Sequence, residues 1–267
     1  GDGFVGDDGF ETAPLAAGSI TDVGTTANVV SGYAFNADTI ATDYAVTLVE
    51  GSLKINAATL TVRADEQTIS FPNDRPETSA LSYQLAGGNV DGETPAFSGN
   101  LGYSDTLALD PLEPDTYENA IVVGTLKLVN NDGFKAGNYT LNVIPANLIV
   151  ENGTFTVALT GGEWIYDAAA HGPELTDTLP GDGVTYYISD GHGGWTSSGT
   201  TIPTVTNVLD GEVTVKVVVT RAGYDPAEAI TTIQITPARM TATVSGYNAK
   251  YDGNAYGITV TPDMPDS

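Results

Sequence analysis

One block of spaced aromatic and aliphatic residues occurs three times in the chain, over residues 44–71, 139–166 and 224–251. Each block runs from a tyrosine to an aliphatic residue, an apolar residue and a final aromatic residue, with the same spacing at all four positions. The blocks hold Tyr44, Ile55, Leu60 and Phe71; Tyr139, Val150, Phe155 and Tyr166; and Tyr224, Ile235, Met240 and Tyr251. The aliphatic residues lie 95 and then 85 positions apart. A period near ninety is too long for a solenoid and predicts tandem small domains.

The repeat divides the 267 residues into four parts. Residues 1–56 are expected to be the back part of a first repeat, since Phe10–Pro14 echoes Gly92–Ala96 in the next one. Complete repeats are predicted over 57–151 and 152–236. Residues 237–267 then form the opening part of a further repeat.

The composition and local patterns predict an all-β fold. The chain holds 31 Gly and 14 Pro, and no stretch keeps a helical period long enough to count as a helix. We expect strands over residues 44–48, 53–55, 60–62, 121–129, 139–143, 155–159 and 213–220, and a hairpin whose Gly-rich tip is 190–194. The interpretation is a set of tandem, small, β-sandwich-like modules in an elongated array. The sequence leaves open whether each module is immunoglobulin-like or β-grasp-like.

The charge and the missing cysteine exclude several classes of function. With 34 acidic and 9 basic residues the formal net charge is −25, so nucleic acid and anionic membrane are poor partners. The chain has no Cys, which excludes disulfides, zinc thiolate sites and thiol nucleophiles. No apolar run reaches the length of a membrane span, so we expect no membrane insertion of this sequence.

The aromatic end of each block resembles a known family. Residues 251–257, which include Tyr251, Asp252 and Gly253, resemble the YDG signature of the MBG and YDG-type repeats of large bacterial cell-surface adhesins. Tyr166 and Asp167 begin a looser copy, and Phe71 begins a third that is similar to a YGD-type variant. The junction at residues 235–238 is also similar to the family's usual form. This resemblance implies an extracellular protein, secreted or on the bacterial surface, whose modules form a stalk with neighbouring repeats as partners.

The motif itself has a structural interpretation. A tyrosine at the end of a strand buries its ring and bonds its hydroxyl to the backbone, while Asp-Gly makes a tight turn. We therefore expect structural roles for the motif residues and buried rings at Tyr166 and Tyr251. The motif residues are Tyr44, Tyr139, Tyr224, Phe71, Tyr166, Asp167, Tyr251, Asp252 and Gly253.

Candidate catalytic and metal sites are weak. The two histidines, His171 and His192, lie in turn-rich stretches without a nucleophile elbow, so the chain is not expected to be an enzyme or to hold a cofactor. Calcium is the one metal considered, because loop carboxylates supply its oxygen ligands. The candidates are Asp2, Asp7 and Asp8, or Asp182 and Asp190, and none has EF-hand spacing. A Lys–Asn isopeptide bond at Lys54 or Lys216 is a further possibility for stalk chemistry.

The predicted function is that of a spacer, a stalk region that holds a binding domain of an adhesin away from the cell. The alternative is a module that binds carbohydrate or mucin, with host or surface glycans as partners. Its candidate residues are Tyr186, Tyr187, His192 and Trp195, because sugar faces stack on exposed rings. Two or more of these rings, exposed and coplanar, would favour the alternative.

Overall fold

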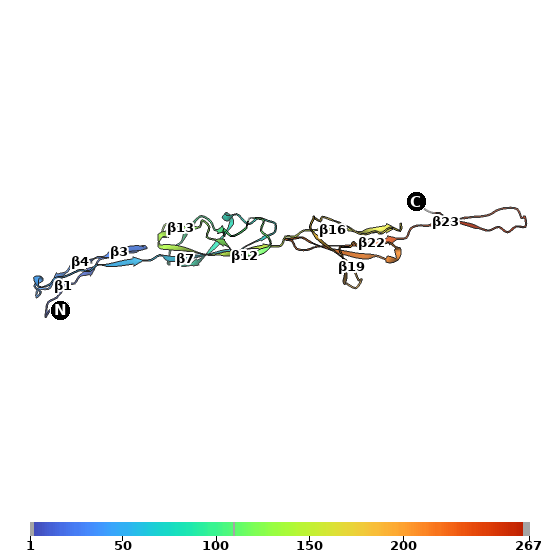
Figure 1. The fold of residues 1–267 in the computed structure, drawn as a ribbon. Helices are drawn as coiled ribbons and strands as arrows, with labels where there is room; N and C mark the ends of the chain where they lie inside the picture. Colours follow the sequence, from blue (N-terminus) through green and yellow to red (C-terminus); the bar gives the residue numbers. More distant parts are fainter. Residues whose placement is uncertain (1–2, 109, 264–267) are drawn as a thin grey trace. The chain divides into compact units, whose positions relative to one another are not determined.

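The computed structural model describes residues 3–108 and 110–263 and is all-β (Figure 1). The part of the chain so described contains no α-helix, only short 3-10 turns between strands. The chain divides into two compact units, Gly1–Glu151 and Asn152–Ser267. Small sheets follow one another along the sequence in each unit.

The first part of the first unit is a two-stranded ribbon, built from three antiparallel pairs. These are β1 (Phe10–Thr12) with β5 (Ala34–Phe35), β2 (Leu15–Ala16) with β4 (Val30–Ser31), and β3 (Gly24–Asn28) with β6 (Gly51–Ile55). The turn η1 (Ala41–Asp43) precedes Tyr44. None of the side chains described between residues 3 and 56 is fully buried, because a ribbon of two strands has no second layer to cover it.

The second repeat completes the first unit with nine strands and two 3-10 turns. The strands are β7 (Ala58–Ala64), β8 (Gln67–Ser70), β9 (Tyr83–Gly87), β10 (Ala96–Ser98), β11 (Gly102–Tyr103), β12 (Asp115–Val122), β13 (Lys127–Val129), β14 (Tyr139–Ile144) and β15 (Ala146–Glu151). The turns are η2 (Thr78–Ala80) and η3 (Ala136–Asn138). The strand orders are β14-β7-β9, β11-β12-β15-β8 and β10-β13.

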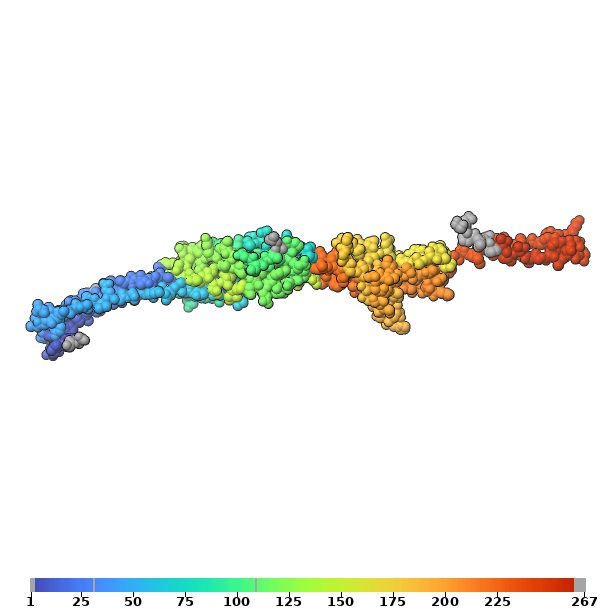
Figure 2. Space-filling model, in the orientation of Figure 1, coloured from blue at the N-terminus to red at the C-terminus, as the bar shows by residue number. Residues whose placement is uncertain are grey.

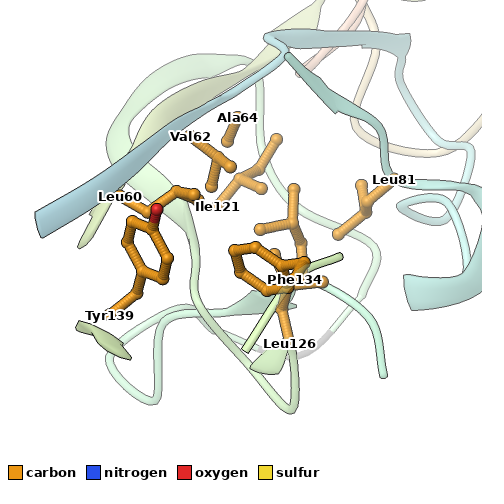
Figure 3. Packing of buried hydrophobic residues seen from close by; sticks show 9 residues of the cluster. Leu60, Val62, Ala64, Leu81, Ile121, Leu126, Phe134 and Tyr139 are labelled. Carbon is orange, nitrogen blue, oxygen red and sulfur yellow. The ribbon is translucent and has the colours of Figure 1, made fainter. Parts of the chain in front are cut away.

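The main core of this repeat is enclosed by residues from different sheets (Figure 3). Leu60 and Val62 on β7 alternate inward, and Ile121 on β12 meets them from a second sheet. Phe134 stacks on Tyr139, with ring centroids 5.0 Å apart. Inward alternation along β7 is what a strand with one buried face requires.

The third repeat opens the second unit with seven strands and the turn η4 (Val208–Asp210). They are β16 (Ala158–Thr160), β17 (Gly162–Ile165), β18 (Glu174–Thr176), β19 (Gly183–Ser189), β20 (Trp195–Gly199), β21 (Val213–Thr220) and β22 (Ala227–Thr236). Five of them form one sheet in the order β17-β22-β21-β19-β20, and β16 pairs with β18. The expected apolar face of residues 213–219 is confirmed, since Val215, Val217 and Val219 are fully buried.

The predicted hairpin is also confirmed as β19–β20, whose tip stands out from its repeat (Figure 2). After the third repeat, β23 (Thr241–Ser245) and β24 (Thr259–Asp263) form an antiparallel pair. Every side chain described from residue 237 to 261 is exposed.

Three strand predictions were wrong in whole or in part. Of the expected strand 155–159, only residues 158 and 159 belong to β16. The expected strand 121–129 is split into β12 and β13 by a turn at Gly124, where φ is +54° and a Cβ would lie 2.4 Å from the backbone nitrogen of Gly102. Residues 44–48, expected to be a strand, form no ladder with any described residue.

Candidate functional site

The most regular feature of the second repeat is a parallel ladder between its first and last strands. Ala58 pairs with Tyr139 and Arg63 with Ile144 in β7 and β14. Gln67 pairs with Leu148 and Ser70 with Glu151 in β8 and β15. The offset of 81 is the same at both ends (139 − 58 and 151 − 70), so the register continues across the bend.

The third repeat holds the same ladder. Gly153 bridges Tyr224 in parallel, and β17 pairs with β22 from Gly162 opposite Ile233 to Ile165 opposite Thr236. The offset is 71 throughout (224 − 153 and 236 − 165). The two complete repeats therefore share one closing arrangement although their other strands differ.

The aromatic residue that ends each of the first two blocks closes this ladder through its backbone. The Phe71 amide donates to the carbonyl of Glu151 at 2.9 Å, and the Tyr166 amide donates to that of Thr236 at 2.9 Å. Each acceptor belongs to the last residue of its repeat. The block therefore ends where the first strand finishes its pairing with the last.

The parallel direction separates the two ends of each repeat. The first strand starts beside the start of the last strand, and the chain leaves the repeat where both finish. Residues 58–70 cover twelve steps, which at about 3.3 Å per residue is roughly 40 Å. The same count applies to residues 153–165 of the third repeat.

The tyrosine that begins each of the first two blocks anchors a turn. The Tyr139 hydroxyl donates to Oε2 of Glu93 at 2.5 Å and accepts the Val90 amide at 3.1 Å. In the first part of the chain, the Tyr44 hydroxyl donates to Oδ2 of Asp8 at 2.6 Å and accepts the Val5 amide at 3.0 Å. The hydrogen bond to the acid raises the pKa of each tyrosine above its usual range.

This arrangement corrects the alignment expected from the sequence. Phe10–Pro14 was matched to Gly92–Ala96, which places Glu11 against Glu93. In the structure Asp8 instead takes the role of Glu93, because each acid accepts a hydrogen bond from the tyrosine that begins a block. Each acid also lies three residues after the valine whose amide donates to the same hydroxyl.

The corresponding turn of the third repeat is held by an arginine. Nε and Nη2 of Arg221 donate to the two carboxylate oxygens of Asp182 at 2.9 and 2.8 Å. The guanidinium also lies 4.2 Å from the ring centroid of Phe155 and 5.7 Å from that of Tyr224. The bond to Arg221 and the Leu179 amide lower the pKa of Asp182 to about 2.

The expectation of buried rings at the YDG-like motifs was wrong. Tyr166 is 42% exposed and Tyr251 is 97% exposed. Tyr166 follows the last pair of its ladder, and Tyr251 lies in a segment whose side chains are all exposed. No second sheet therefore covers either ring. The turns follow the expected chemistry, because Asp167 and Asp252 accept the amides two residues on, and Gly253 has φ +85°. Tyr256 also donates to Asp252.

The four candidate ligand-binding residues do not form one surface. Tyr186 is only 4% exposed and lies in the core, which corrects its proposed role in binding. Its neighbour Tyr187 points to the opposite face of the sheet, as alternation requires. Trp195 is 37% exposed, and His192 lies at the hairpin tip with Nδ1 2.9 Å from the Asp190 carbonyl oxygen.

A lysine that the sequence argument did not place in this site joins the two outer rings. Nζ of Lys216 lies 5.1 Å from the ring centroid of Tyr187 and 4.9 Å from that of Trp195. It is also 3.8 Å from Oε1 of Glu228. The ammonium group of Lys216 therefore lies over one face of each ring, in cation–π contact with both. The contact follows from the direct pairing of Tyr187 in β19 with Lys216 in β21, and no local pattern in the sequence shows which residues of these strands pair.

Three of the five proposed calcium ligands, Asp8, Asp182 and Asp190, already have protein partners. Asp8 accepts from Tyr44, Asp182 binds Arg221, and Asp190 accepts the amides of His192 and Gly194. Asp2 lies outside the described residues. Within 3–108 and 110–263, no group of three or more His, Cys, Asp or Glu side chains could hold a metal ion.

The histidines have structural neighbours. His171 stacks on Trp164 with centroids 5.0 Å apart, and its Nε2 lies 3.0 Å from Oδ1 of Asp167. This bond to His171 lowers the pKa of Asp167.

No helix in the described part of the chain has the length and apolar character needed to span a bilayer.

Comparison with known proteins gives no matching family model and no matching curated protein. The resemblance to MBG and YDG-type repeats stays a prediction.

Proposed function

We propose that this chain is a load-bearing spacer, the stalk region of an extracellular bacterial surface adhesin that holds a binding domain away from the cell. The observation that carries the proposal is the parallel ladder between the first and last strands of each complete repeat. A tension applied through the two ends of a repeat acts along these strands in opposite directions. The ladder bonds are then loaded in shear, together, instead of one after another.

Several features support a structural role. In the second repeat, residues of the β14-β7-β9 sheet and of the β11-β12-β15-β8 sheet meet in the main core cluster, which fits a β-sandwich-like module. The −25 charge keeps neighbouring chains apart. The proposed partners are neighbouring repeats. The role requires no cofactor and no catalytic group.

Force spectroscopy on the full chain tests the proposal. Because the chain has no Cys, a pair of introduced cysteines defines the pulling points. Pulling through Ala57→Cys and Glu151→Cys loads the ladder of the second repeat in shear. Pulling through Ala57→Cys and Gly137→Cys instead applies force at the two strand starts and peels the ladder bond by bond.

We expect the shear geometry to unfold at a clearly higher force than the peeling geometry, because forced unfolding is limited by the bonds that break together. Equal forces in the two geometries, or a lower force in shear, would contradict a load-bearing role.

A cross-linked variant identifies the ladder as the resisting element. Thr61 and Asn142 are directly paired, and their side chains are within 3.4 Å. A disulfide between Thr61→Cys and Asn142→Cys prevents the residues between them from extending under force. At about 3.5 Å per residue, the length that no longer extends is on the order of 280 Å. The second repeat should then give no unfolding step of that size until the disulfide is reduced.

A second candidate function, the binding of glycans, is favoured by one observation. Tyr187 and Trp195 lie on the outer face of the same sheet, with Lys216 between them. Exposed aromatic rings beside a polar group can stack on sugar rings. We place this function second because Lys216 already occupies the ring faces.

A further inference from the structure

The sequence contains a single asparagine that is followed by glycine, at Asn152 and Gly153. In such a pair the backbone nitrogen of the glycine can attack Cγ of the asparagine, because glycine has no Cβ to hinder the close approach. The N–Cγ bond forms while the Cγ–Nδ2 bond breaks, and the side-chain amide leaves as ammonia with the proton of the glycine nitrogen. Water then opens the cyclic succinimide at either carbonyl and gives aspartate or isoaspartate. The reaction therefore consumes only water and needs no oxidant or reductant.

The fold holds both of the reacting groups. The Gly153 amide donates to the carbonyl of Gly223 at 2.9 Å, and the Gly153 carbonyl accepts the Asp225 amide at 2.9 Å. Nδ2 of Asn152 donates to Oδ1 of Asp225 at 2.8 Å. Gly153 is buried, whereas Asn152 is exposed to water. The nitrogen of Gly153 can reach Cγ of Asn152 only after it leaves Gly223 and the side-chain amide leaves Asp225.

These hydrogen bonds belong to the parallel ladder of the third repeat. Gly153 opposite Tyr224 is the first bridge of that ladder, which continues to Ile165 opposite Thr236. The segment that holds Tyr224 is also fixed from within the repeat, since the guanidinium of Arg221 lies against the Tyr224 ring and binds Asp182. The bridge is therefore tied to the rest of the repeat and should open together with it.

We propose that Asn152 is a self-modification site, which the ladder of the third repeat keeps closed and which converts to aspartate or isoaspartate when the repeat opens. Each product opposes closing. An aspartate at this position places a second carboxylate beside Asp225, where the amide of Asn152 donated a hydrogen bond. An isoaspartate adds a methylene group to the main chain just before Gly153, which displaces the first bridge. The modification is then a lasting record that the repeat has opened, and this inference does not depend on the spacer function.

Conversion at residue 152 of the full chain tests the proposal. The chain is incubated in mildly alkaline buffer, once folded and once in urea above its tryptophan-detected midpoint. Peptide mass spectrometry with chromatographic separation of aspartate and isoaspartate then measures the converted fraction. We expect conversion in urea to be at least about tenfold faster than in the folded chain. The matched control Asn152→Gln keeps an amide donor on a longer side chain that does not close the same ring, and should show no conversion.

Variants of β22 test whether the fold controls the reaction. Ile233→Ala removes a fully buried side chain that pairs at Gly162, away from Asn152, and should raise the conversion rate of the chain without urea at least about tenfold. If this variant does not fold, its rate should equal the rate in urea. Ile230→Ala, at a side chain that is 57% exposed, should leave the rate unchanged.

The effect of the product is measured on a variant that carries it from the start. Asn152→Asp should lower the tryptophan-detected urea midpoint of the third repeat, whereas Asn248→Asp, the same change at an exposed residue outside that repeat, should not. Equal conversion rates in the folded and urea-unfolded chain, an unchanged rate in Ile233→Ala, or an unchanged midpoint in Asn152→Asp would each overturn the proposal.

Discussion

The hydroxyl of Tyr139 donates to the carboxylate of Glu93 at 2.5 Å, although 46 residues separate them in the sequence. Tyr44 and Asp8 have the same relationship in the first part of the chain, at 2.6 Å. In both cases the tyrosine begins the last extended segment of its repeat. The acid ends a turn, and the amide of the first residue of that turn, Val90 or Val5, donates to the same hydroxyl. In the second repeat the bond therefore fixes a loop onto Tyr139, the residue at which the parallel ladder of β7 and β14 starts.

Replacing Tyr139 with Phe should loosen this loop without emptying the core. The ring stays buried against Phe134, but the Val90 amide and the Glu93 carboxylate lose their partner. We expect faster hydrogen exchange at the Val90 amide and a lower thermal midpoint for the second repeat. Tyr166→Phe removes a hydroxyl from a ring that is 42% exposed and should change stability by less than about 0.5 kcal/mol. An unchanged exchange rate at Val90 would argue against the anchoring role.

The two faces of β22 should respond differently to truncation. Ile233 is fully buried, while Ile230 on the same strand is 57% exposed. Ile233→Ala should reduce the free energy of unfolding by about 2–5 kcal/mol, and Ile230→Ala by less than about 0.5 kcal/mol. Both tryptophans of the chain, Trp164 and Trp195, lie in the third repeat, so tryptophan fluorescence in a urea titration reports on this repeat. Similar losses in the two variants would contradict the sheet's orientation.

The third repeat should lose stability in acid through Asp182. The pKa of this carboxyl is lowered from 3.8 to about 2 by its bonds to Arg221 and the Leu179 amide. A lowered pKa contributes stability that is complete above the unfolded value and is lost as the pH falls from about 4 to about 2. The wild-type chain should therefore be more stable than Asp182→Asn at pH 6, and the difference should shrink over that interval.

Urea midpoints followed by tryptophan fluorescence measure this difference. Arg221→Lys keeps the charge but loses the two-point contact, and should behave as an intermediate. A difference between wild type and Asp182→Asn that stays constant from pH 6 to pH 2 would show that the carboxylate does not stabilise the repeat through its charge.

The sequence predicted the elements that depend on local alternation. Val215, Val217 and Val219 were assigned to one face, because a period of two with β-branched residues requires a strand. Tyr186 was placed among possible ligands because sugar faces stack on exposed rings, although Val184 shares its face. That apolar neighbour, which packs against the same core, was the signal that Tyr186 is buried.

The rest depended on contacts between distant residues. The Glu93–Tyr139 and Asp182–Arg221 bonds join loops to strands 46 and 39 residues away, and no local period encodes them. Residues 44–48 have the alternation of a strand, but their ladder requires a partner like β7, so alternation alone could not show whether it forms. The turn at Gly124 was missed because it interrupts a continuous β-branched stretch.

Glycan binding distinguishes the two functional proposals. If the chain is a spacer, a glycan and mucin screen should find no ligand whose binding depends on the outer rings of the third repeat. If the second function is right, Tyr187→Ala with Trp195→Ala should abolish binding, while Tyr166→Ala, at an exposed ring elsewhere in the repeat, should not. The urea midpoint of each variant separates a lost ligand contact from a lost fold.

The two complete repeats should stand alone. Residues 57–236 contain both ladders and all the buried residues of the three core clusters. The side chains described in 237–261 are exposed, and an isolated pair of strands buries too little area to offset its ordering entropy. We expect a fragment of residues 57–236 to unfold with the same tryptophan-detected urea midpoint as the full chain in dilute solution. A fragment of residues 57–226 lacks β22, the partner of both β17 and β21, and should leave the third repeat unfolded. Strong and equal protection from hydrogen exchange for residues 241–244 and 213–219 of dilute full-length chain would show that these boundaries are wrong.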